Sequence, residues 1–104
     1  MNWKKLFVPG TDISVAEAKE YLAARDSMTY QLLDVRQPAE YEAGHLAGAI
    51  LIPLKELPDR VASLDKDKPT IVYCAIGGRS KVAAQLLAGL GFANVYNMVG
   101  GIKA

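Results

Sequence analysis

The sequence predicts an α/β domain built on a parallel sheet. Short apolar runs of four or five residues alternate with longer segments in which apolar residues recur at helical spacing. The short runs are apolar along most of their length, which is typical of strands buried on both faces of a parallel sheet. Strands that alternate with helices in a chain of 104 residues imply right-handed crossover connections.

Length and composition predict a single domain. A chain of 104 residues with 51% hydrophobic residues can form one core but not two ordinary ones. We expect one domain over residues 1–104, with residues 1–10 at its periphery and Trp3 and Phe7 covering an edge of the core. The balance of 12 Lys and Arg against 11 Asp and Glu provides no strong attraction to nucleic acid or to an anionic membrane.

The first residues do not resemble a leader or an anchor. The apolar stretch of residues 6–8 stops at Pro9, which makes it too short for a signal peptide. No apolar run approaches the roughly 20 residues that span a bilayer. We therefore expect a cytoplasmic location, no membrane partner and no nucleic-acid partner.

The first predicted element is a helix. Ser14 and Glu17 have the spacing of a capping box, in which each side chain accepts from the other residue's backbone N–H. A helix of about ten residues from this point has one apolar face. That face is formed by Val15, Ala18, Tyr21 and Leu22.

The remaining elements follow in order. The predicted strands are residues 31–35, 49–52, 70–73 and 95–98, and two shorter helices are predicted at residues 38–41 and 55–60. Before the last strand, apolar residues from Val82 to Leu90 repeat at helical spacing, and Gly91 stands where a helix C-terminal cap belongs.

Cys74 is the only cysteine in the sequence. It cannot form an internal disulfide, and one cysteine with one histidine cannot supply the usual closed zinc site. The sequence therefore implies no metal and no organic cofactor. Cys74 is either a buried apolar side chain or a thiol with a chemical role, and only its setting decides between them.

The residues around Cys74 in the sequence predict a site that stabilises a negative charge at its sulfur. It follows the strand of residues 70–73 directly, and ligands of open α/β sheets bind beyond the carboxyl ends of strands. Gly77 and Gly78 allow backbone angles that turn successive N–H groups inward as an anion nest. A helix beginning near Arg79 or Ser80 adds free N–H groups and a positive dipole end, and Arg79 adds a full charge.

A cysteine in such a field is expected to have a lowered pKa and to be a better nucleophile. The spacing alone, however, leaves a plain turn as an equal alternative.

Three segments of the chain together resemble the signatures of the rhodanese family. The first contains Asp34-Val35-Arg36, then Glu40-Tyr41, then Gly44-His45-Leu46-Ala47-Gly48-Ala49. The second is Val72-Tyr73-Cys74-Ala75-Ile76-Gly77-Gly78-Arg79-Ser80, which resembles the active loop of that family, and Gly100-Gly101-Ile102 resembles its closing motif. The three segments occur in the family's order and extend over most of the domain.

The resemblance implies a fold and an activity. The fold is a small rhodanese-like domain with a five-stranded, mostly parallel sheet flanked by helices on both faces. Cys74 matches the cysteine that forms a persulfide, and the loop around its outer sulfur is Ala75, Ile76, Gly77, Gly78, Arg79 and Ser80. The implied activity is sulfur transfer from a donor such as thiosulfate or a persulfide to a cyanide or thiol acceptor.

The resemblance also suggests roles for residues around the loop. Asp34 and Arg36 stand two residues apart at the end of the predicted strand, and for Arg36 we expect a structural ion pair or hydrogen bonds that brace a loop. The resemblance points the same way: Arg36 is expected to hold the connection after the second strand together with Glu40 or Glu42, and Asp34 is expected to brace the active loop. His45, the only histidine, is expected to fix a turn by a hydrogen bond instead of acting as a base.

Two alternatives stay open. Cysteine phosphatases of related fold also place a cysteine and an arginine around an anion cradle, but their loop is one residue longer, so this reading is the weaker one. The other alternative is a sulfur-carrier or interaction module with low turnover on small molecules, because Ala75 and Ile76 bring no charge to the loop.

The chain stops at Ala104, where relatives commonly continue with an aromatic residue and a final helix. We therefore expect it to be part of a longer protein, in which this domain passes sulfur to an attached domain or senses it there. The sequence leaves the physiological donor, the acceptor and the oligomeric state open.

Overall fold

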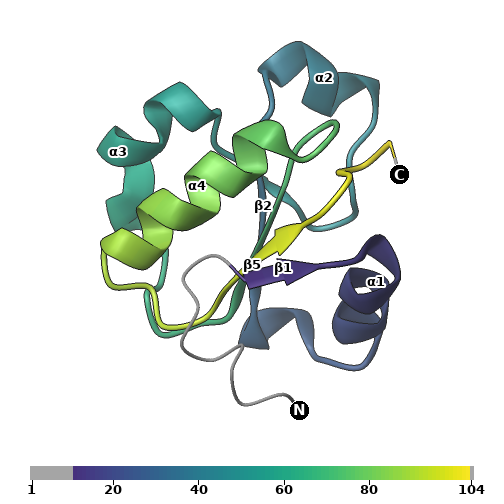
Figure 1. Cartoon of the computed structure of the whole chain (residues 1–104), viewed down its shortest axis with the longest axis horizontal. Helices are drawn as coiled ribbons and strands as arrows, with labels where there is room; N and C mark the ends of the chain where they lie inside the picture. Colours follow the sequence, from purple (N-terminus) through teal and green to yellow (C-terminus); the bar gives the residue numbers. More distant parts are fainter. Residues whose placement is uncertain (1–10, 104) are drawn as a thin grey trace.

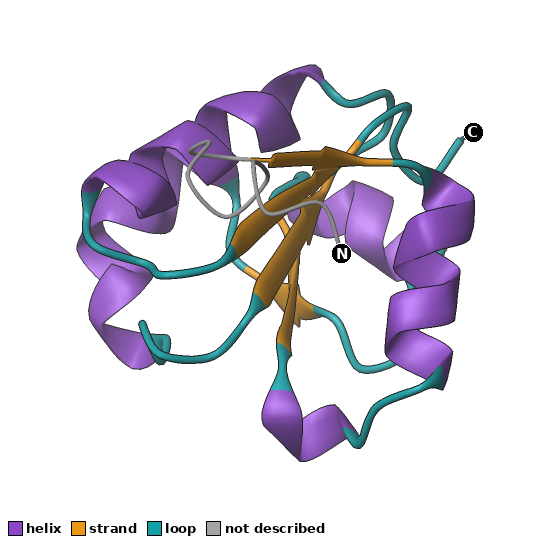
Figure 2. Cartoon of the chain, turned by 60° about the horizontal axis from the view of Figure 1, so that its bottom comes forward, coloured by secondary structure: helices purple, strands orange, loops and turns teal. Residues whose placement is uncertain are grey.

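A central parallel sheet with helices on both faces forms the fold of this chain, seen in a computed structural model that describes residues 11–103 (Figures 1 and 2). The strands are β1 (Thr11–Ile13), β2 (Gln31–Asp34), β3 (Ile50–Leu51), β4 (Thr70–Tyr73) and β5 (Val95–Met98). Their order in the sheet is β1-β5-β4-β2-β3, and every neighbouring pair is parallel. The predicted five-stranded parallel architecture is confirmed.

Helices and short helical turns connect the strands. The α-helices are α1 (Val15–Ala23), α2 (Pro38–Ala43), α3 (Leu57–Arg60) and α4 (Gly78–Gly89), and the 3₁₀ turns are η2 (Ser27–Thr29), η3 (Leu54–Glu56) and η4 (Val61–Ser63). No helix among residues 11–103 is long and apolar enough to cross a membrane.

The helix ends follow from the residues that cap them. Ser14 Oγ accepts from the Glu17 N–H at 3.0 Å, and the Glu17 carboxylate accepts from the Ser14 N–H at 2.9 Å, which confirms the capping box of α1. Gly91 follows the end of α4 with φ of 94°, a left-handed angle that glycine adopts without strain. Helix α4 begins at Gly78, slightly earlier than the sequence predicts.

Each face of the sheet has its own apolar cluster. On the α4 face, side chains of β2 and β4 pack with α3 and α4; this cluster includes Leu33, Val72, Cys74, Ala83 and Leu87. The cluster on the α1 face consists of Ile13, Ala18, Leu32, Ala49, Ile71, Tyr73 and Met98. Because successive residues of a strand point to opposite faces, the Cys74 side chain lies toward α4 and that of Tyr73 away from it.

The register of the sheet places Cys74 at its carboxyl edge. Asp34 pairs with Tyr73, so β2 and β4 end side by side, and the Val35 N–H donates to the Tyr73 carbonyl at 3.2 Å. The connections that follow, from Val35 and from Cys74, therefore leave the sheet next to each other.

Some boundaries differ from the predicted ones. The apolar pattern does not predict β1, and β3 is shorter than residues 49–52. Residues 55–60 do not form one helix, because a 3₁₀ turn occupies residues 54–56 and α3 follows it. The expectations for residues 1–10, including Trp3 and Phe7, lie outside the described residues.

Candidate active site

Cys74 lies in a cradle of backbone N–H groups where β4 ends and α4 begins. Its side chain is fully buried. The sulfur accepts hydrogen bonds from the Gly77 N–H at 3.1 Å and from the Ser80 N–H at 3.4 Å. In its protonated form the thiol donates to Ser80 Oγ, also at 3.4 Å. The loop thus directs donors at the sulfur, as expected for a site that stabilises an anion there.

Of the two loop glycines, only Gly77 requires the absence of a side chain. Its φ is 106°, and a Cβ at this position would stand 3.1 Å from the Gly100 nitrogen. Gly78 has no positive φ and has open space where a Cβ would lie. The backbone angle expected of both glycines is therefore found at Gly77 alone, and Gly78 is the first residue of α4.

The end of the chain holds the loop from its other side. The Ile102 N–H donates to the Cys74 carbonyl at 2.8 Å, and the Lys103 N–H donates to the Ala75 carbonyl at 3.1 Å. Gly101, with φ of 68°, lies so close that a Cβ there would be 2.5 Å from the carbonyl carbon of Ala75. These two hydrogen bonds fix the backbone of Cys74 and Ala75. The loop is thereby held in the orientation that turns the N–H groups of Gly77 and Ser80 toward the sulfur.

Ser80 connects the thiol to a polar chain below the loop. Its hydroxyl lies 2.6 Å from Asn97 Oδ1 and 3.1 Å from the Gly77 carbonyl. Asn97 Nδ2 in turn donates to the Asp12 carboxylate at 3.0 Å. Sequence reasoning missed Asn97 and Asp12; the available signal was an asparagine inside the apolar run of β5, since a buried amide needs partners.

Two opposing influences act on the Cys74 thiol. Burial is the largest single one and raises its pKa, but hydrogen bonds from the Ser80 hydroxyl and from the N–H groups of Ser80, Gly77 and Ile76 together outweigh it. The net effect is a pKa below the ordinary thiol value. The predicted direction is confirmed, although its main cause is the hydrogen bonds of Ser80 and not the charge of Arg79.

This pKa shift predicts a pH dependence of alkylation. Below the folded-state pKa both folded and unfolded chains carry the thiol, and between the two pKa values only the folded chain carries the thiolate. The rate of alkylation by iodoacetamide should therefore rise with pH at a lower midpoint in the native protein than in the urea-unfolded protein. A native midpoint at or above that of the unfolded chain would contradict the arrangement of donors described above.

Arg79 does not face the sulfur as a free cation. Its guanidinium forms two hydrogen bonds with the Glu40 carboxylate of α2, at 2.7 and 2.9 Å. These bonds lower the pKa of Glu40 to about 2, with a further contribution from the Gln37 N–H, so the carboxylate stays ionised at neutral pH. The charge of Arg79, expected to attract an anion, is therefore compensated by Glu40.

Arg36 forms the predicted structural ion pair with Asp34, but it does not pair with Glu40 or Glu42. Its guanidinium bonds to the Asp34 carboxylate, with Nη2 to Oδ2 at 2.8 Å, and to the Gly44 carbonyl at 2.7 Å. Glu40 is engaged by Arg79, so the expected pairing of Arg36 with Glu40 or Glu42 is wrong. Arg36 still holds the connection after β2, and the hydrogen bonds of Asp34 go to this connection instead of the active loop.

Replacing Arg36 with alanine should destabilise the domain more than it impairs its chemistry. Asp34 is fully buried, and the loss of its partner leaves an unpaired buried carboxylate, at a cost of about 3 kcal/mol. Urea unfolding measures this cost. The control is Arg60→Ala, which breaks an exposed pair with Glu56 and should cost under about 1 kcal/mol. Loss of activity in a fully folded Arg36→Ala protein would contradict the structural role.

His45 fixes the turn that follows α2. Its Nδ1 lies 2.8 Å from the Tyr41 carbonyl, and its ring stacks on that of Tyr41 with centroids 3.6 Å apart. The predicted turn-fixing hydrogen bond is confirmed. The neighbouring Leu46 N–H donates to the Tyr73 hydroxyl at 3.0 Å, which ties this turn to β4.

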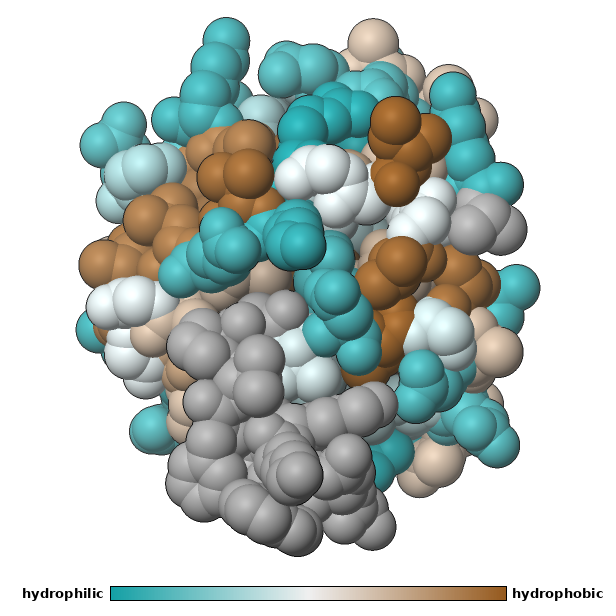
Figure 3. Space-filling model, viewed as in Figure 1, coloured by the Kyte–Doolittle hydropathy of each residue, from teal (hydrophilic) through white to brown (hydrophobic). Residues whose placement is uncertain are grey.

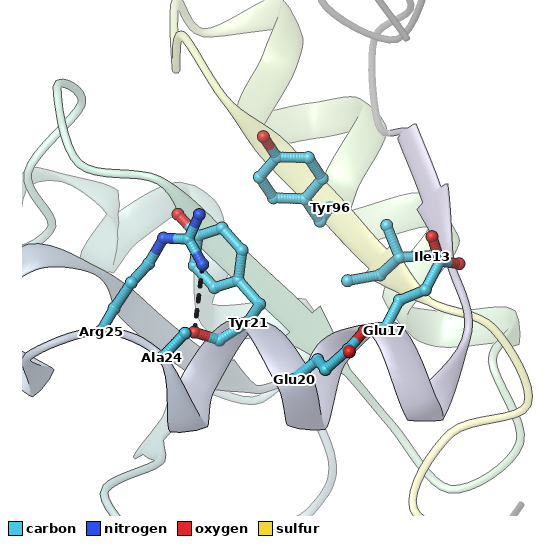
Figure 4. Close-up of a pocket in the computed structure, with 7 residues that line it drawn as sticks. All are labelled: Ile13, Glu17, Glu20, Tyr21, Ala24, Arg25 and Tyr96. Atoms are coloured by element: carbon cyan, nitrogen blue, oxygen red, sulfur yellow. Dashed lines mark hydrogen bonds between the residues drawn. The ribbon is translucent and has the colours of Figure 1, made fainter. Parts of the chain in front are cut away.

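A separate groove lies between α1 and strands β1 and β5. Its volume is about 430 Å³, and its lining includes Tyr21, Arg25 and Tyr96 but not Cys74. Figure 4 shows Arg25 lying over the Tyr21 ring. The guanidinium carbon of Arg25 is 3.7 Å from the ring centroid, and its Nη1 donates to the Tyr21 carbonyl. The groove holds no thiol, and residues 11–103 contain no cluster of His, Cys, Asp and Glu that could hold a metal. The candidate site is the loop around Cys74.

The fold and this loop define a known class of domain. The model of the rhodanese-like domain family matches residues 14–104, and the chain belongs to that family.

The chain is 37% identical over 91 residues to the thiosulfate sulfurtransferase GlpE of Coxiella burnetii, covering 88% of this chain and 82% of that protein. The crystal structure of a rhodanese-like domain protein from Staphylococcus aureus matches with a TM-score of 0.82 at 31% identity, covering 90% of this chain and 89% of that one.

Other relatives are longer than this chain. It is 47% identical over 73 residues to the protein YqhL of Bacillus subtilis, a match that covers 70% of this chain but only 58% of that protein. The structure of a NAD-dependent persulfide reductase from A. fulgidus matches with a TM-score of 0.69 at 32% identity, covering 90% of this chain and 15% of that one. Rhodanese-like domains thus also occur as parts of larger proteins.

Proposed function

We propose that this chain is a sulfurtransferase that carries sulfane sulfur as a persulfide on Cys74. One observation carries the proposal: at the carboxyl end of β4, the Cys74 sulfur accepts hydrogen bonds from two backbone N–H groups. Such donors stabilise the thiolate that attacks the donor and also the anionic persulfide that results. The sulfurtransferase GlpE, similar over most of this chain, supports the same activity.

The reaction has two displacement steps. In the first, the Cys74 thiolate attacks the sulfane sulfur of the donor, a bond forms between the two sulfurs, and the donor leaves with the electron pair of its broken bond. In the second, the acceptor attacks the outer sulfur, and the electron pair of the sulfur–sulfur bond returns to Cys74. No general base is required at neutral pH when the thiol is already ionised.

The surroundings of the loop favour a donor that carries little charge. Arg79, the only cation of the loop sequence, is paired with Glu40, so a dianion such as thiosulfate gains little from it. Ile76 is 73% exposed, and Figure 3 shows hydrophobic surface at the upper right, over the loop that enters α4 in Figure 1. We propose an organic or protein persulfide as the better donor and a thiol or cyanide as the acceptor.

Sulfur transfer to cyanide tests this function. Thiocyanate formation is measured with thiosulfate and, separately, with a low-molecular-weight persulfide as donor. The proposal expects turnover with both donors and a higher kcat/KM with the persulfide. Transfer from neither donor contradicts the sulfurtransferase, and a single slow loading without turnover supports the sulfur-carrier alternative.

Replacing Glu40 with glutamine should improve the use of thiosulfate. The substitution frees the Arg79 guanidinium from its counter-charge, and about 1 kcal/mol of added attraction lowers the KM for thiosulfate about fivefold. The KM for the organic persulfide should change much less. The control is Glu42→Gln, which removes the same charge from the same helix. An equal effect of both substitutions would contradict a specific role of the Arg79–Glu40 pair.

The domain organisation is also part of the proposal. We propose one rhodanese-like domain over residues 1–104 that belongs to a longer cytoplasmic protein and passes sulfur to an attached domain or partner. The large persulfide reductase that contains a similar domain supports this arrangement.

A further inference from the structure

Asn97 is a buried polar residue with a direct contact to the candidate site. It lies on β5 with 3% of its surface exposed, among the apolar residues of the strand. Its Oδ1 is 2.6 Å from Ser80 Oγ, and Ser80 contacts the Cys74 sulfur. Asn97 is thus connected to the Cys74 thiol through a single residue, Ser80.

Asp12 fixes which way the Asn97 amide points. A carboxylate has only acceptor oxygens, so the atom of Asn97 that lies 3.0 Å from Asp12 Oδ1 must be the NH₂ donor. The amide oxygen then faces Ser80 as an acceptor. This assignment rests on the hydrogen-bond network and excludes the flipped amide.

The Ser80 hydroxyl has a single proton for competing acceptors. These are Asn97 Oδ1, the Gly77 carbonyl and, once ionised, the Cys74 sulfur. The contact with Asn97 is the shortest of the three. When Cys74 is a thiol, its S–H donates to Ser80 and the Ser80 hydroxyl donates to Asn97. A thiolate gains that hydroxyl only when the proton turns away from Asn97.

We propose that Asn97, oriented by Asp12, is a positioning residue that competes with the Cys74 sulfur for the Ser80 proton and so sets the balance between thiol and thiolate at Cys74. The catalytic meaning of this balance rests on the proposed function. In the persulfide the negative charge lies on the outer sulfur, so the Ser80 hydroxyl continues to donate to Asn97 Oδ1. When the acceptor takes the outer sulfur and the electron pair returns to Cys74, the hydroxyl turns to the new thiolate.

The charged and titratable groups around the thiol come from several elements. Arg79 on α4, which is paired with Glu40 on α2, interacts electrostatically with Cys74. The others lie on neighbouring elements: Asp34 and Arg36 at the end of β2, Tyr73 on the opposite face of β4, and Asp12 on β1 next to Asn97. Of these, only Asp12 is changed in the experiments below, and its charge is controlled by comparing two backgrounds.

The test is the pH midpoint of alkylation of the native protein in a double-mutant cycle. Asn97→Leu removes the acceptor at similar volume, so the Ser80 hydroxyl is free to donate to the thiolate and the midpoint should fall by about one unit. Ser80→Ala removes the hydroxyl and should raise the midpoint. In the Ser80→Ala background, Asn97→Leu should leave it unchanged, because Asn97 acts through Ser80.

The outcomes separate positioning from a general structural effect. A fall with Asn97→Leu that disappears without the Ser80 hydroxyl supports the proposal. No change, a rise, or an equal shift in both backgrounds overturns it. Because alkylation needs no sulfur donor, these shifts can be present in a protein that never carries sulfur, which would contradict only the proposed function.

Asp12→Ala repeats the test if Asn97→Leu does not fold. Asp12 is exposed, and its removal lets the Asn97 amide turn its NH₂ toward Ser80. The expected result is a smaller fall of the midpoint. Loss of the Asp12 charge shifts the midpoint equally with and without the Ser80 hydroxyl. A fall that is larger with the hydroxyl than in the Ser80→Ala background therefore supports the proposal. An equal shift in both backgrounds overturns it.

Discussion

Replacing Gly101 with alanine should disrupt the active loop and with it sulfur transfer. The new Cβ would collide with the Cys74 carbonyl oxygen and stand 2.5 Å from the Ala75 carbonyl, both of which are backbone groups that cannot turn aside. The residue also has φ of 68°, where a side chain adds strain. We expect a loss of about 3 kcal/mol in the free energy of unfolding.

The effect on activity should be larger than that on stability. A shift of the loop by about 1 Å moves the N–H donors of Gly77 and Ser80 relative to the sulfur, which corresponds to about a hundredfold loss in rate. The matched control is Gly91→Ala, because Gly91 has φ of 94° but open space around its Cβ position. Near-normal activity of Gly101→Ala would show that the end of the chain does not hold the loop.

Replacing Cys74 with serine should abolish sulfur transfer and leave the fold intact. A serine hydroxyl cannot form a persulfide, and no other cysteine exists in the sequence to replace it. The oxygen still accepts from the N–H groups of Gly77 and Ser80, so the free energy of unfolding should change by less than about 1 kcal/mol. Thiocyanate formation and urea unfolding measure the two effects.

Residual turnover in a folded Cys74→Ser protein would place the chemistry elsewhere. If Cys74→Ser loses both its fold and its activity, the result would be explained by a packing role of the Cys74 side chain in the α4 cluster. Only the combination of lost transfer and retained stability assigns the reaction to the sulfur atom.

The fold could be predicted where local signals were strong. The capping box at Ser14, the apolar runs of β2, β4 and β5 and the glycine after α4 each act within a few residues. Strand β1 was missed because three residues, Thr11 to Ile13, carry too little pattern and gain their structure by pairing with β5. The short β3 likewise depends on its pairing with β2.

The site was predictable in its centre but not in its charge pairing. The position of Cys74 between a strand and a glycine-containing loop could be read from the chain. The pairing of Arg79 with Glu40 joins residues 39 positions apart. From the sequence alone, Arg36 was an equally good partner for Glu40. The hydrogen bonds from Ser80 to Asn97 and from Asn97 to Asp12 could not be predicted either. Asn97 and Asp12 are 85 positions apart, and only the order of the strands in the sheet shows that they are neighbours.

The most direct test of the central claim is the intact mass of the reduced protein after incubation with a persulfide donor and then with cyanide. The proposed function predicts a gain of one sulfur atom, which cyanide removes as thiocyanate and which Cys74→Ser does not show. A mass that stays unchanged with organic persulfide and thiosulfate alike, while Cys74 still reacts with iodoacetamide, would contradict a sulfur carrier at this site.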